Sequence, residues 1–154
     1  MAAVELVTIA WGLAPRADSW PRMRRPSRRT WDLMAATDAF EAWVIAWPPG
    51  GAIELHDHGK SAGAVIVARG ALFETTIVEH PDGRLVTDTA VLRAGTAISF
   101  DASRVHDLVN VGIAPAISVQ VYSPRLSTMT FYEIAGNHLV ASRTDHYQCG
   151  RAVP

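Results

Sequence analysis

The chain has 154 residues, of which 49% are hydrophobic and 19% are charged, and its formal net charge is −1. These proportions are typical of a folded globular protein and exclude intrinsic disorder, and the small net charge argues against general binding to nucleic acid or to a membrane surface. Cys149 is the only cysteine, which excludes an internal disulfide, and no apolar run reaches the roughly 18 residues of a membrane span, so we expect a cytoplasmic protein.

The length predicts a single domain over residues 1–154. Residues 1–38 are expected to form a helix and an arm. Apolar residues recur at helical spacing over residues 3–13, and Pro15 should end this short amphipathic helix, which we expect to cover the rest of the fold. Residues 15–30 hold six arginines and three prolines and are predicted to be a connector. Its arginines are either solvated or form a site for phosphate or carboxylate groups.

Beyond residue 39 the pattern changes to short segments rich in aromatic and β-branched residues, separated by Gly, Pro, Asp and Asn. This pattern is typical of an all-β sandwich or barrel, which we expect over residues 39–143, with a tail at 144–154. The predicted strands cover residues 40–47, 53–58, 63–68, 71–79, 85–88, 90–92, 97–100, 105–111, 115–122, 128–135 and 139–142.

Three histidines in two of these segments indicate a metal site. His56 and His58 are two residues apart on a predicted strand, so their imidazoles should project side by side and can share one ion. His106 and Asn110 are four apart on another predicted strand and should share a face. A lone histidine is more often structural, but three at this spacing favour metal binding. Three imidazoles leave open coordination positions, as catalytic sites require.

These histidine segments resemble the two cupin motifs. The first motif runs from Gly51 through the His-x-His pair to Gly70, and the second runs from Gly95 through His106 to Asn110. Within the cupins, residues 40–135 are similar to the cysteine dioxygenase-like thiol dioxygenases. The residues that carry this similarity are Trp47, His56-Asp57-His58, Ser61, Gly70, Glu74-Thr75, His106, Asn110, Pro115-Ala116, Ser118 and Tyr122-Ser123-Pro124.

The resemblance implies an all-β cupin fold, the double-stranded β-helix or jelly-roll barrel, with a short N-terminal helical segment. It implies Fe(II) held by His56, His58 and His106. Nickel, zinc and manganese stay open, because imidazole suits several metals. The glutamate ligand that many cupins add is missing, since Ala62 and Gly63 stand at its positions. An all-imidazole site keeps the full charge of the ion, which favours a thiolate ligand.

The implied activity is the addition of both atoms of O2 to the sulfur of a small thiol, cysteine or a mercapto acid, to give a sulfinate. Ser118, Gln120 and Tyr122 match the family's Ser-x-His-x-Tyr face and are the implied catalytic residues. Gln120 replaces histidine, and it can hydrogen-bond the phenol of Tyr122 but cannot shuttle a proton. In the animal enzymes a cysteine at the position of Gly63 is crosslinked to the tyrosine, and Gly63 excludes that bond.

Other candidate residues surround this set. The arginine that binds the substrate carboxylate in cysteine dioxygenases should lie upstream of residue 40, and Arg28 and Arg29 are the candidates, because arginine is a bidentate partner of carboxylates. Asn110 either orients a metal ligand or closes a turn. Asp57 and Asp107 each follow a histidine and should point away from the metal, either as structural residues or as residues that support the metal ligands through neighbouring elements.

Two further functions stay open beside a thiol dioxygenase. The chain could be a divergent metal-dependent cupin, an oxygenase, lyase or isomerase acting on a non-thiol biosynthetic intermediate, or a non-catalytic ligand-binding cupin. The expected partners are a small-molecule substrate and O2, with the oligomeric state left open. Consumption of O2 together with a thiol separates the first function from the others.

Overall fold

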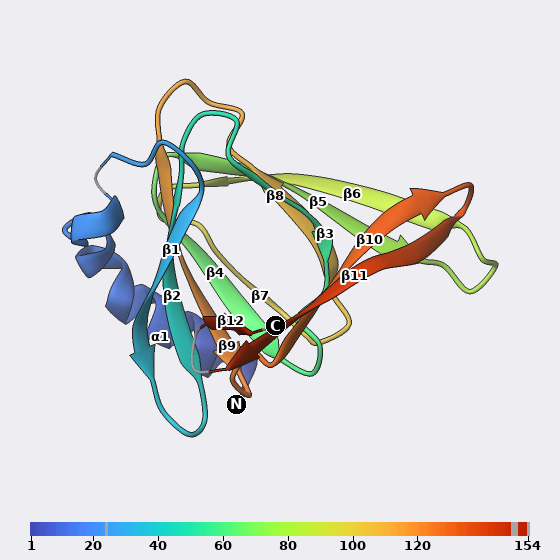
Figure 1. The fold of residues 1–154 in the computed structure, drawn as a ribbon, viewed down its shortest axis with the longest axis horizontal. Coiled ribbons are helices and arrows are strands. Elements are labelled where there is room, and N and C mark those ends of the chain that lie inside the picture. The colour runs from blue at the N-terminus through green and yellow to red at the C-terminus, as the bar shows by residue number, and fades with distance from the viewer. Residues whose placement is uncertain (24, 149–150, 154) are drawn as a thin grey trace.

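The computed structural model describes residues 1–23, 25–148 and 151–153. Within these ranges, two antiparallel sheets face each other across an apolar core, and helix α1 (Ala3–Ala17) lies outside one of them (Figure 1). The predicted all-β architecture with a short N-terminal helix is confirmed. The strands are β1 (Thr30–Ala36), β2 (Glu41–Trp47), β3 (Ala52–His56), β4 (Ala62–Arg69), β5 (Ala71–Glu79), β6 (Leu85–Arg93), β7 (Ala97–Phe100), β8 (Val105–Val109), β9 (Ala116–Ser123), β10 (Thr128–Ala135), β11 (His138–Gln148) and β12 (Arg151–Val153).

The first sheet has the order β1-β2-β9-β4-β7, and the second has the order β12-β11-β10-β3-β8-β5-β6. Every residue of β2 and β9 is buried, because one face of the first sheet meets the second sheet and the other face meets α1. Side chains alternate between the faces of a strand, so the two faces can differ in size. In β2 the inward face carries large residues and the outward face small ones, namely Trp43, Ile45 and Trp47 against Ala42, Val44 and Ala46.

Helix α1 packs on this outer face through Leu6, Ala10 and Ala17, which are fully buried. The predicted end before Pro15 is wrong, because the helix continues to Ala17. A proline removes one main-chain hydrogen bond, but the burial of Ala17 against the sheet holds the last turn in place. No helix in the described ranges is long and apolar enough to span a bilayer.

Three other expectations on the elements are corrected. The arm contains the edge strand β1, whose partly exposed residues give no clear alternation, and β1 is followed by β2 in an antiparallel pair. The two strands predicted over 85–92 form one strand, β6, because Thr89 continues the ladder opposite Thr75. The tail begins too early in the prediction, since β11 continues to Gln148 and pairs with β12. Most of β11 is exposed, so its sequence lacks an apolar pattern. Cys149 lies outside the described residues.

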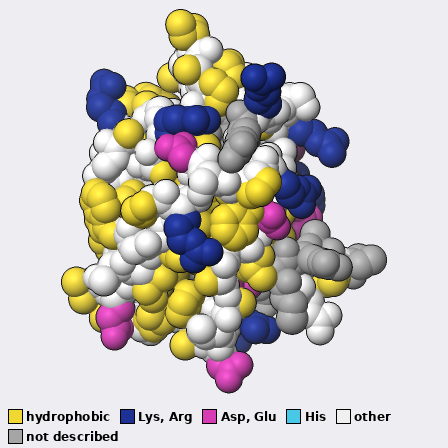
Figure 2. Space-filling model, turned by 90° about the vertical axis from the view of Figure 1, so that its left-hand side faces the viewer, with side chains coloured by type: hydrophobic (Ala, Val, Ile, Leu, Met, Phe, Trp, Pro, Cys, Tyr) yellow, Lys and Arg dark blue, Asp and Glu magenta, His cyan; other side chains and the backbone are white. Residues whose placement is uncertain are grey.

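The connector arginines divide into two groups. Arg16, Arg22, Arg25 and Arg28 are exposed. On the face seen in Figure 2, basic side chains are spread among hydrophobic and uncharged ones, as expected of a solvated connector. Arg29 differs because it is partly buried. Arg24 lies outside the described residues.

Gly63 of β4 provides space for an aromatic ring in the inter-sheet core. It lies opposite Phe100 of β7 on one side and opposite Tyr122 of β9 on the other. A Cβ atom at Gly63 would overlap the Phe100 ring, with Cε2 at 2.7 Å and Cζ closer still. The ring stacks on the imidazole of His58, with 4.7 Å between centroids, and stands edge-on to Tyr122. The missing side chain of Gly63 therefore lets Phe100 support two inward-facing residues.

We expect Gly63→Ala to lower the free energy of unfolding by about 1–3 kcal/mol, because the new methyl group overpacks a closed core. Gly12→Ala is the matched control, since nothing lies within 4 Å of a Cβ atom at this helix position. That change should raise the free energy of unfolding by roughly 0.5–1 kcal/mol, the usual gain for Ala over Gly in a helix. Urea denaturation of the three proteins measures both effects. Equal shifts for the two variants would show that Phe100 moves aside without cost.

Candidate metal centre

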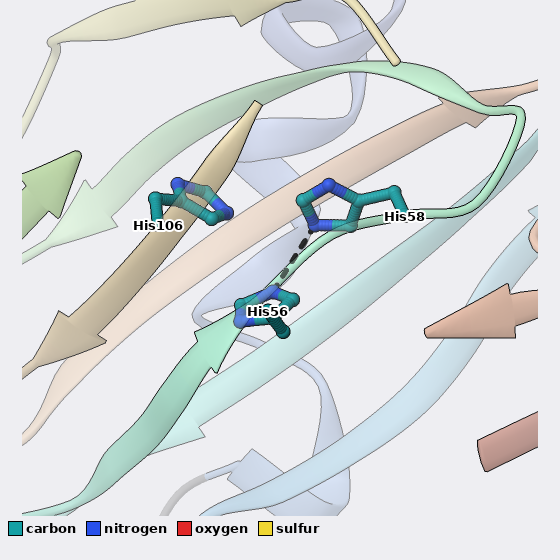
Figure 3. A group of neighbouring side chains, drawn as sticks. All are labelled: His56, His58 and His106. Atoms are coloured by element: carbon teal, nitrogen blue, oxygen red, sulfur yellow. Dashed lines mark hydrogen bonds between the residues drawn. The ribbon is translucent and has the colours of Figure 1, made fainter. Parts of the chain in front are cut away.

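His56, His58 and His106 gather between the two sheets (Figure 3). His56 is the last residue of β3 and lies directly opposite His106 of β8, so the two side chains share the inward face. The three side chains are almost fully buried, with residue exposures of 2%, 0% and 0%. The predicted meeting of these three residues is confirmed.

The path of the chain to His58 differs from the prediction. We expected one strand through both histidines, but β3 ends at His56 and His58 begins a turn. The turn closes with a hydrogen bond of 3.0 Å from the Ser61 N–H to the His58 carbonyl. Gly59 has a φ of 59°, a left-handed conformation that glycine adopts without strain. The turn folds the His58 ring back toward His56, and the ring centroids lie 4.8 Å apart.

Asp57 fixes this turn against β10. Its Oδ1 accepts hydrogen bonds from the main-chain N–H groups of Gly59 (3.0 Å) and Thr130 (3.1 Å), and its Oδ2 accepts from the Tyr132 hydroxyl (2.7 Å). Burial, and after it the bond to Asp57, raises the pKa of the Tyr132 phenol to about 12, so the phenol stays a donor. The structural role expected for Asp57 therefore takes a definite form: it orients the loop that carries His58.

The ring nitrogens are spaced for one shared ion. Nε2 of His56 and Nε2 of His58 are 3.1 Å apart, and the ligand atoms of the three residues all lie within 4.8 Å of one another. Two nitrogens that bind one ion at about 2.1 Å, at right angles, would be separated by roughly 3.0 Å. The pair of His56 and His58 already has this separation, and the third ring lies within reach.

Hydrogen bonds on the far nitrogens select the tautomers. His56 Nδ1 lies 2.8 Å from the Glu54 carbonyl oxygen, which can only accept, so Nδ1 carries the proton and Nε2 keeps a lone pair. His106 Nδ1 lies 2.7 Å from Oε1 of the Glu74 carboxylate, so here too Nδ1 donates and Nε2 keeps a lone pair. The Nε2 atom of His106 is buried and has no hydrogen-bond partner among the described residues. A buried polar atom without a partner is costly, and a metal ion would satisfy it. The donor set therefore fits a divalent metal.

Burial and neighbouring charges keep the rings of His56 and His58 uncharged. Burial lowers the pKa of His56 well below the usual value, and the charges of His106 and of the nearby arginines act in the same direction. Burial likewise lowers the pKa of His58, followed by the charges of His56 and His106. Metal ions bind the neutral imidazole. At neutral pH these two ligands therefore need not lose a proton before they bind.

No role was predicted for Glu74, although it is one of the residues that carry the family resemblance. Thr76 of β5 lies opposite His106, and Glu74 shares the inward face two residues earlier. Its carboxylate is buried, and an Arg104 guanidinium nitrogen lies 3.4 Å from Oε1. A carboxylate that accepts from a metal-ligating histidine fixes its orientation and raises its basicity. The feature of the sequence that could have revealed this role was an acidic residue at an inward-facing position of a predicted strand.

A cavity of about 40 Å³ adjoins His56, enough for roughly three water molecules. Its other polar lining comes from Gln120, Tyr122, Arg29 and Tyr147. The remaining wall is apolar and largely aromatic, with Trp31, Trp43, Trp47, Ile45, Ile53, Leu126 and Met129. The site therefore has a small chamber with mostly apolar walls beside His56.

The strand β9 presents Ser118, Gln120 and Tyr122 to the interior, as predicted. The Tyr122 hydroxyl donates a short hydrogen bond to Oε1 of Gln120. Burial raises the pKa of Tyr122 well above the usual value, so its phenol is protonated at neutral pH. The Ser118 hydroxyl instead accepts a hydrogen bond of 2.9 Å from the indole N–H of Trp47. Ser118 thus orients a wall of the cavity, while the other two residues face it.

The two candidate arginines separate clearly. Arg29 lines the cavity, and its guanidinium lies 4.9 Å from the ring centroid of Trp31 and 5.5 Å from that of Trp47. Burial lowers its pKa, while interactions with Tyr122, Tyr147 and Glu54 oppose that shift. No carboxylate among the described residues forms an ion pair with Arg29. Arg28 is exposed, so Arg29 alone is placed to meet a ligand in the cavity.

Asn110 follows the last residue of β8. Its amide nitrogen donates to the carbonyls of Trp47 (2.9 Å) and Ala114 (2.8 Å), and its Oδ1 accepts from the Gly112 N–H at 2.9 Å. Of the two roles considered for Asn110, these contacts favour the closing of a turn.

Comparison with known proteins agrees with this geometry. A family model described as cysteine dioxygenase type I matches residues 4–135. The chain resembles an oxalate oxidase solved in complex with the substrate analogue glycolate, with 20% identity and a TM-score of 0.59, over 71% of this chain and 57% of that one. This chain therefore spans a little over half the length of that protein.

Two bacterial structures have the same architecture. An uncharacterized conserved protein with a double-stranded β-helix domain from Klebsiella pneumoniae is 21% identical, with a TM-score of 0.58 over 75% of this chain and 87% of that one. An oxalate decarboxylase from Lactobacillus farciminis, solved as a formate complex, is 19% identical, with a TM-score of 0.55 over 64% of this chain and 30% of that one. At these identities the similarities establish the cupin fold, as predicted.

We expect Glu74→Ala to weaken metal binding by roughly 10–100-fold, because His106 loses the acceptor that fixes its tautomer. Glu74→Gln should weaken it less, since the amide oxygen can still accept the Nδ1 proton. Glu79→Ala changes an exposed glutamate of the same strand and serves as the control. Competition of each protein with a chromophoric chelator for Co(II) gives the affinities. Equal affinities for wild type and Glu74→Ala would contradict the assigned role.

Proposed function

Because this chain belongs to the cysteine dioxygenase type I family, we propose that it is a mononuclear non-haem Fe(II) thiol dioxygenase acting on a small thiol that carries a carboxylate. The observation that carries the proposal is a cluster of three imidazoles, one of which lines a cavity that also holds Arg29, an arginine with no ion-pair partner among the described residues. His56, His58 and His106 would hold the metal. Iron, when bound, supplies a Lewis-acid site for a thiolate and the redox chemistry that joins O2 to sulfur.

The overall reaction balances without another reductant. A thiol and one O2 give one sulfinic acid, so the sulfur is oxidised by four electrons and both oxygen atoms are reduced onto it. The thiol proton is released when the thiolate forms. The three neutral imidazoles add no negative charge of their own, so a thiolate and a divalent ion lower each other's electrostatic cost in the buried site.

Tyr122 and Gln120 would position the reactants. The Tyr122 phenol is protonated and donates to Gln120, so its oxygen can accept a hydrogen bond from a second group in the cavity. The side-chain amide nitrogen of Gln120 remains a donor. Because glutamine does not titrate, we infer that the pair orients the substrate or O2 without transferring a proton.

Arg29 would bind the substrate carboxylate. Its two tryptophan neighbours cover the faces of the guanidinium, so the donors at its edge remain for a planar anion. The lining of the cavity contains one cation and no acidic side chain. The net positive charge of this lining supports cysteine or a mercapto acid as the substrate and disfavours a thiol that carries only an ammonium group. With a single cysteine in the sequence, we also propose a reducing, cytoplasmic location.

We expect O2 uptake by the anaerobically Fe(II)-loaded protein with at least one of cysteine, 3-mercaptopropionate and mercaptosuccinate, and none with cysteamine, because cysteamine lacks the carboxylate. An oxygen electrode and mass spectrometry should give one O2 consumed for each sulfinate formed. His106→Ala should lose both tight metal binding and uptake. If protein that demonstrably holds iron consumes no O2 with any thiol, the dioxygenase proposal fails and a divergent cupin acting on a non-thiol substrate remains.

We expect Arg29→Gln to raise KM for the preferred carboxylate thiol by roughly 10–100-fold, the usual cost of removing a charged hydrogen-bond partner. The neighbouring variant Arg28→Gln should leave KM unchanged, since Arg28 is exposed outside the cavity. Initial rates over a range of thiol concentrations compare the two. Similar changes in both variants would show that general surface charge, rather than a contact in the cavity, attracts the substrate.

A further inference from the structure

Strand β11 supplies a cavity residue from outside the part of the chain that matches the family model. The match ends at residue 135, and β11 begins at His138. In Figure 1, β11 runs beside β10 across the front of the molecule and toward the first sheet. Tyr147, near the end of β11, reaches the same cavity as His56 and Arg29.

Two contacts hold Tyr147 at this place. Its main-chain N–H donates a hydrogen bond of 2.9 Å to the carbonyl of Ser127, the residue before β10. Its ring stands edge-on to Trp43, with centroids 6.1 Å apart and planes at 81°. This geometry is a favourable arrangement for two aromatic rings. The side chain is half-buried, so it forms part of the wall and also reaches the outside.

The phenol of Tyr147 is an available hydrogen-bond donor. Burial, and after it the charge of Asp145, raises its pKa, while Arg29 and Arg143 oppose the rise, so the hydroxyl is protonated at neutral pH. Its hydroxyl has no hydrogen-bond partner among the described residues. Arg29 and Tyr147 line the same cavity, so both can reach one ligand there.

We propose that Tyr147 and Arg29 together form the subsite for the acidic end of the substrate, so that the C-terminal strand β11 is part of the active site. This inference rests on the proposed function, since it concerns the same cavity. A carboxylate has two oxygens and accepts only, and it can take hydrogen bonds from the guanidinium and from the phenol together. The half-buried position of Tyr147 also makes this residue a wall that the substrate passes on entry.

Zinc-loaded protein tests the subsite without oxygen chemistry, because Zn(II) binds imidazole and thiolate but has no redox activity. Calorimetry would compare 3-mercaptopropionate with 3-mercapto-1-propanol, which differ only at the acidic group. We expect wild type to prefer the carboxylate. Tyr147→Phe keeps the ring against Trp43 and should lower the affinity for the carboxylate about tenfold, with the alcohol unchanged. His146→Ala, at an exposed neighbouring position, should bind both as wild type does.

Two results would overturn the proposal: equal wild-type affinities for the two thiols, or an unchanged carboxylate preference in Tyr147→Phe. Thermal unfolding of this variant shows whether its fold is retained, and quenching of tryptophan fluorescence by 3-mercaptopropionate gives a second measure of binding. A failure of the proposed function can be distinguished from a failure of the subsite. If iron-loaded wild type consumes no O2 while the zinc-loaded protein keeps a carboxylate preference that depends on Tyr147, the subsite stands and the dioxygenase does not.

Discussion

The arrangement of the site depends on the orientation of three buried imidazoles whose ligand atoms all lie within 4.8 Å of one another. The Nε2 atoms of His56 and His58 lie 3.1 Å apart, a hydrogen-bond distance, so one of the two nitrogens can donate a proton to the other. The Nε2 atom of His106 has no partner among the described residues, so the fold must hold this ring against the cost of an unsatisfied buried atom. Each ring is restrained by a different device. A main-chain carbonyl fixes His56, the carboxylate of Glu74 fixes His106, and the loop clamped by Asp57 carries His58, on which Phe100 stacks. These restraints are made before any metal binds, so binding costs little reorganisation.

The double burial of the first sheet explains how such a small chain can keep this site rigid. Strands β2 and β9 are covered on one face by α1 and on the other by the second sheet. The outward face uses small and branched residues against the helix, which leaves the inward face free for large aromatic residues and for Gln120 and Tyr122. The helix therefore contributes to the cavity indirectly: it buries the outer face of the strands whose inner face carries the chemistry.

The sequence predicted the fold class, the three histidines and the inward face of β9, because each rests on a local rule: alternation along a strand, or the spacing of a motif. The predictions from the sequence were wrong where contacts between distant parts of the chain determine the local structure. Ala17 keeps helix α1 intact past Pro15, a turn places His58 instead of a strand, and the exposed strand β11 has no apolar pattern to reveal it. Choosing Arg29 over Arg28 also needed the structure. Neighbouring residues on an extended chain point in opposite directions, and the sequence alone does not say which direction is inward.

The substitution of glutamine for histidine beside Tyr122 has a consequence for the whole cavity. A histidine could gain a proton and add a positive charge, whereas Gln120 leaves Arg29 as the one charged side chain in the described lining of the chamber. With the Tyr122 hydroxyl engaged by Gln120, the donors that remain in the described lining include the guanidinium, the glutamine amide, the Tyr147 phenol and the indole N–H of Trp43. A chamber supplied mainly with donors favours a ligand that presents acceptors, and it penalises an ammonium group that would need an acceptor or a negative partner. An α-amino thiol must therefore either lose its ammonium proton to solvent, so that the free amine nitrogen could bind a metal, or remain unpaired near Arg29, and a mercapto acid has neither cost.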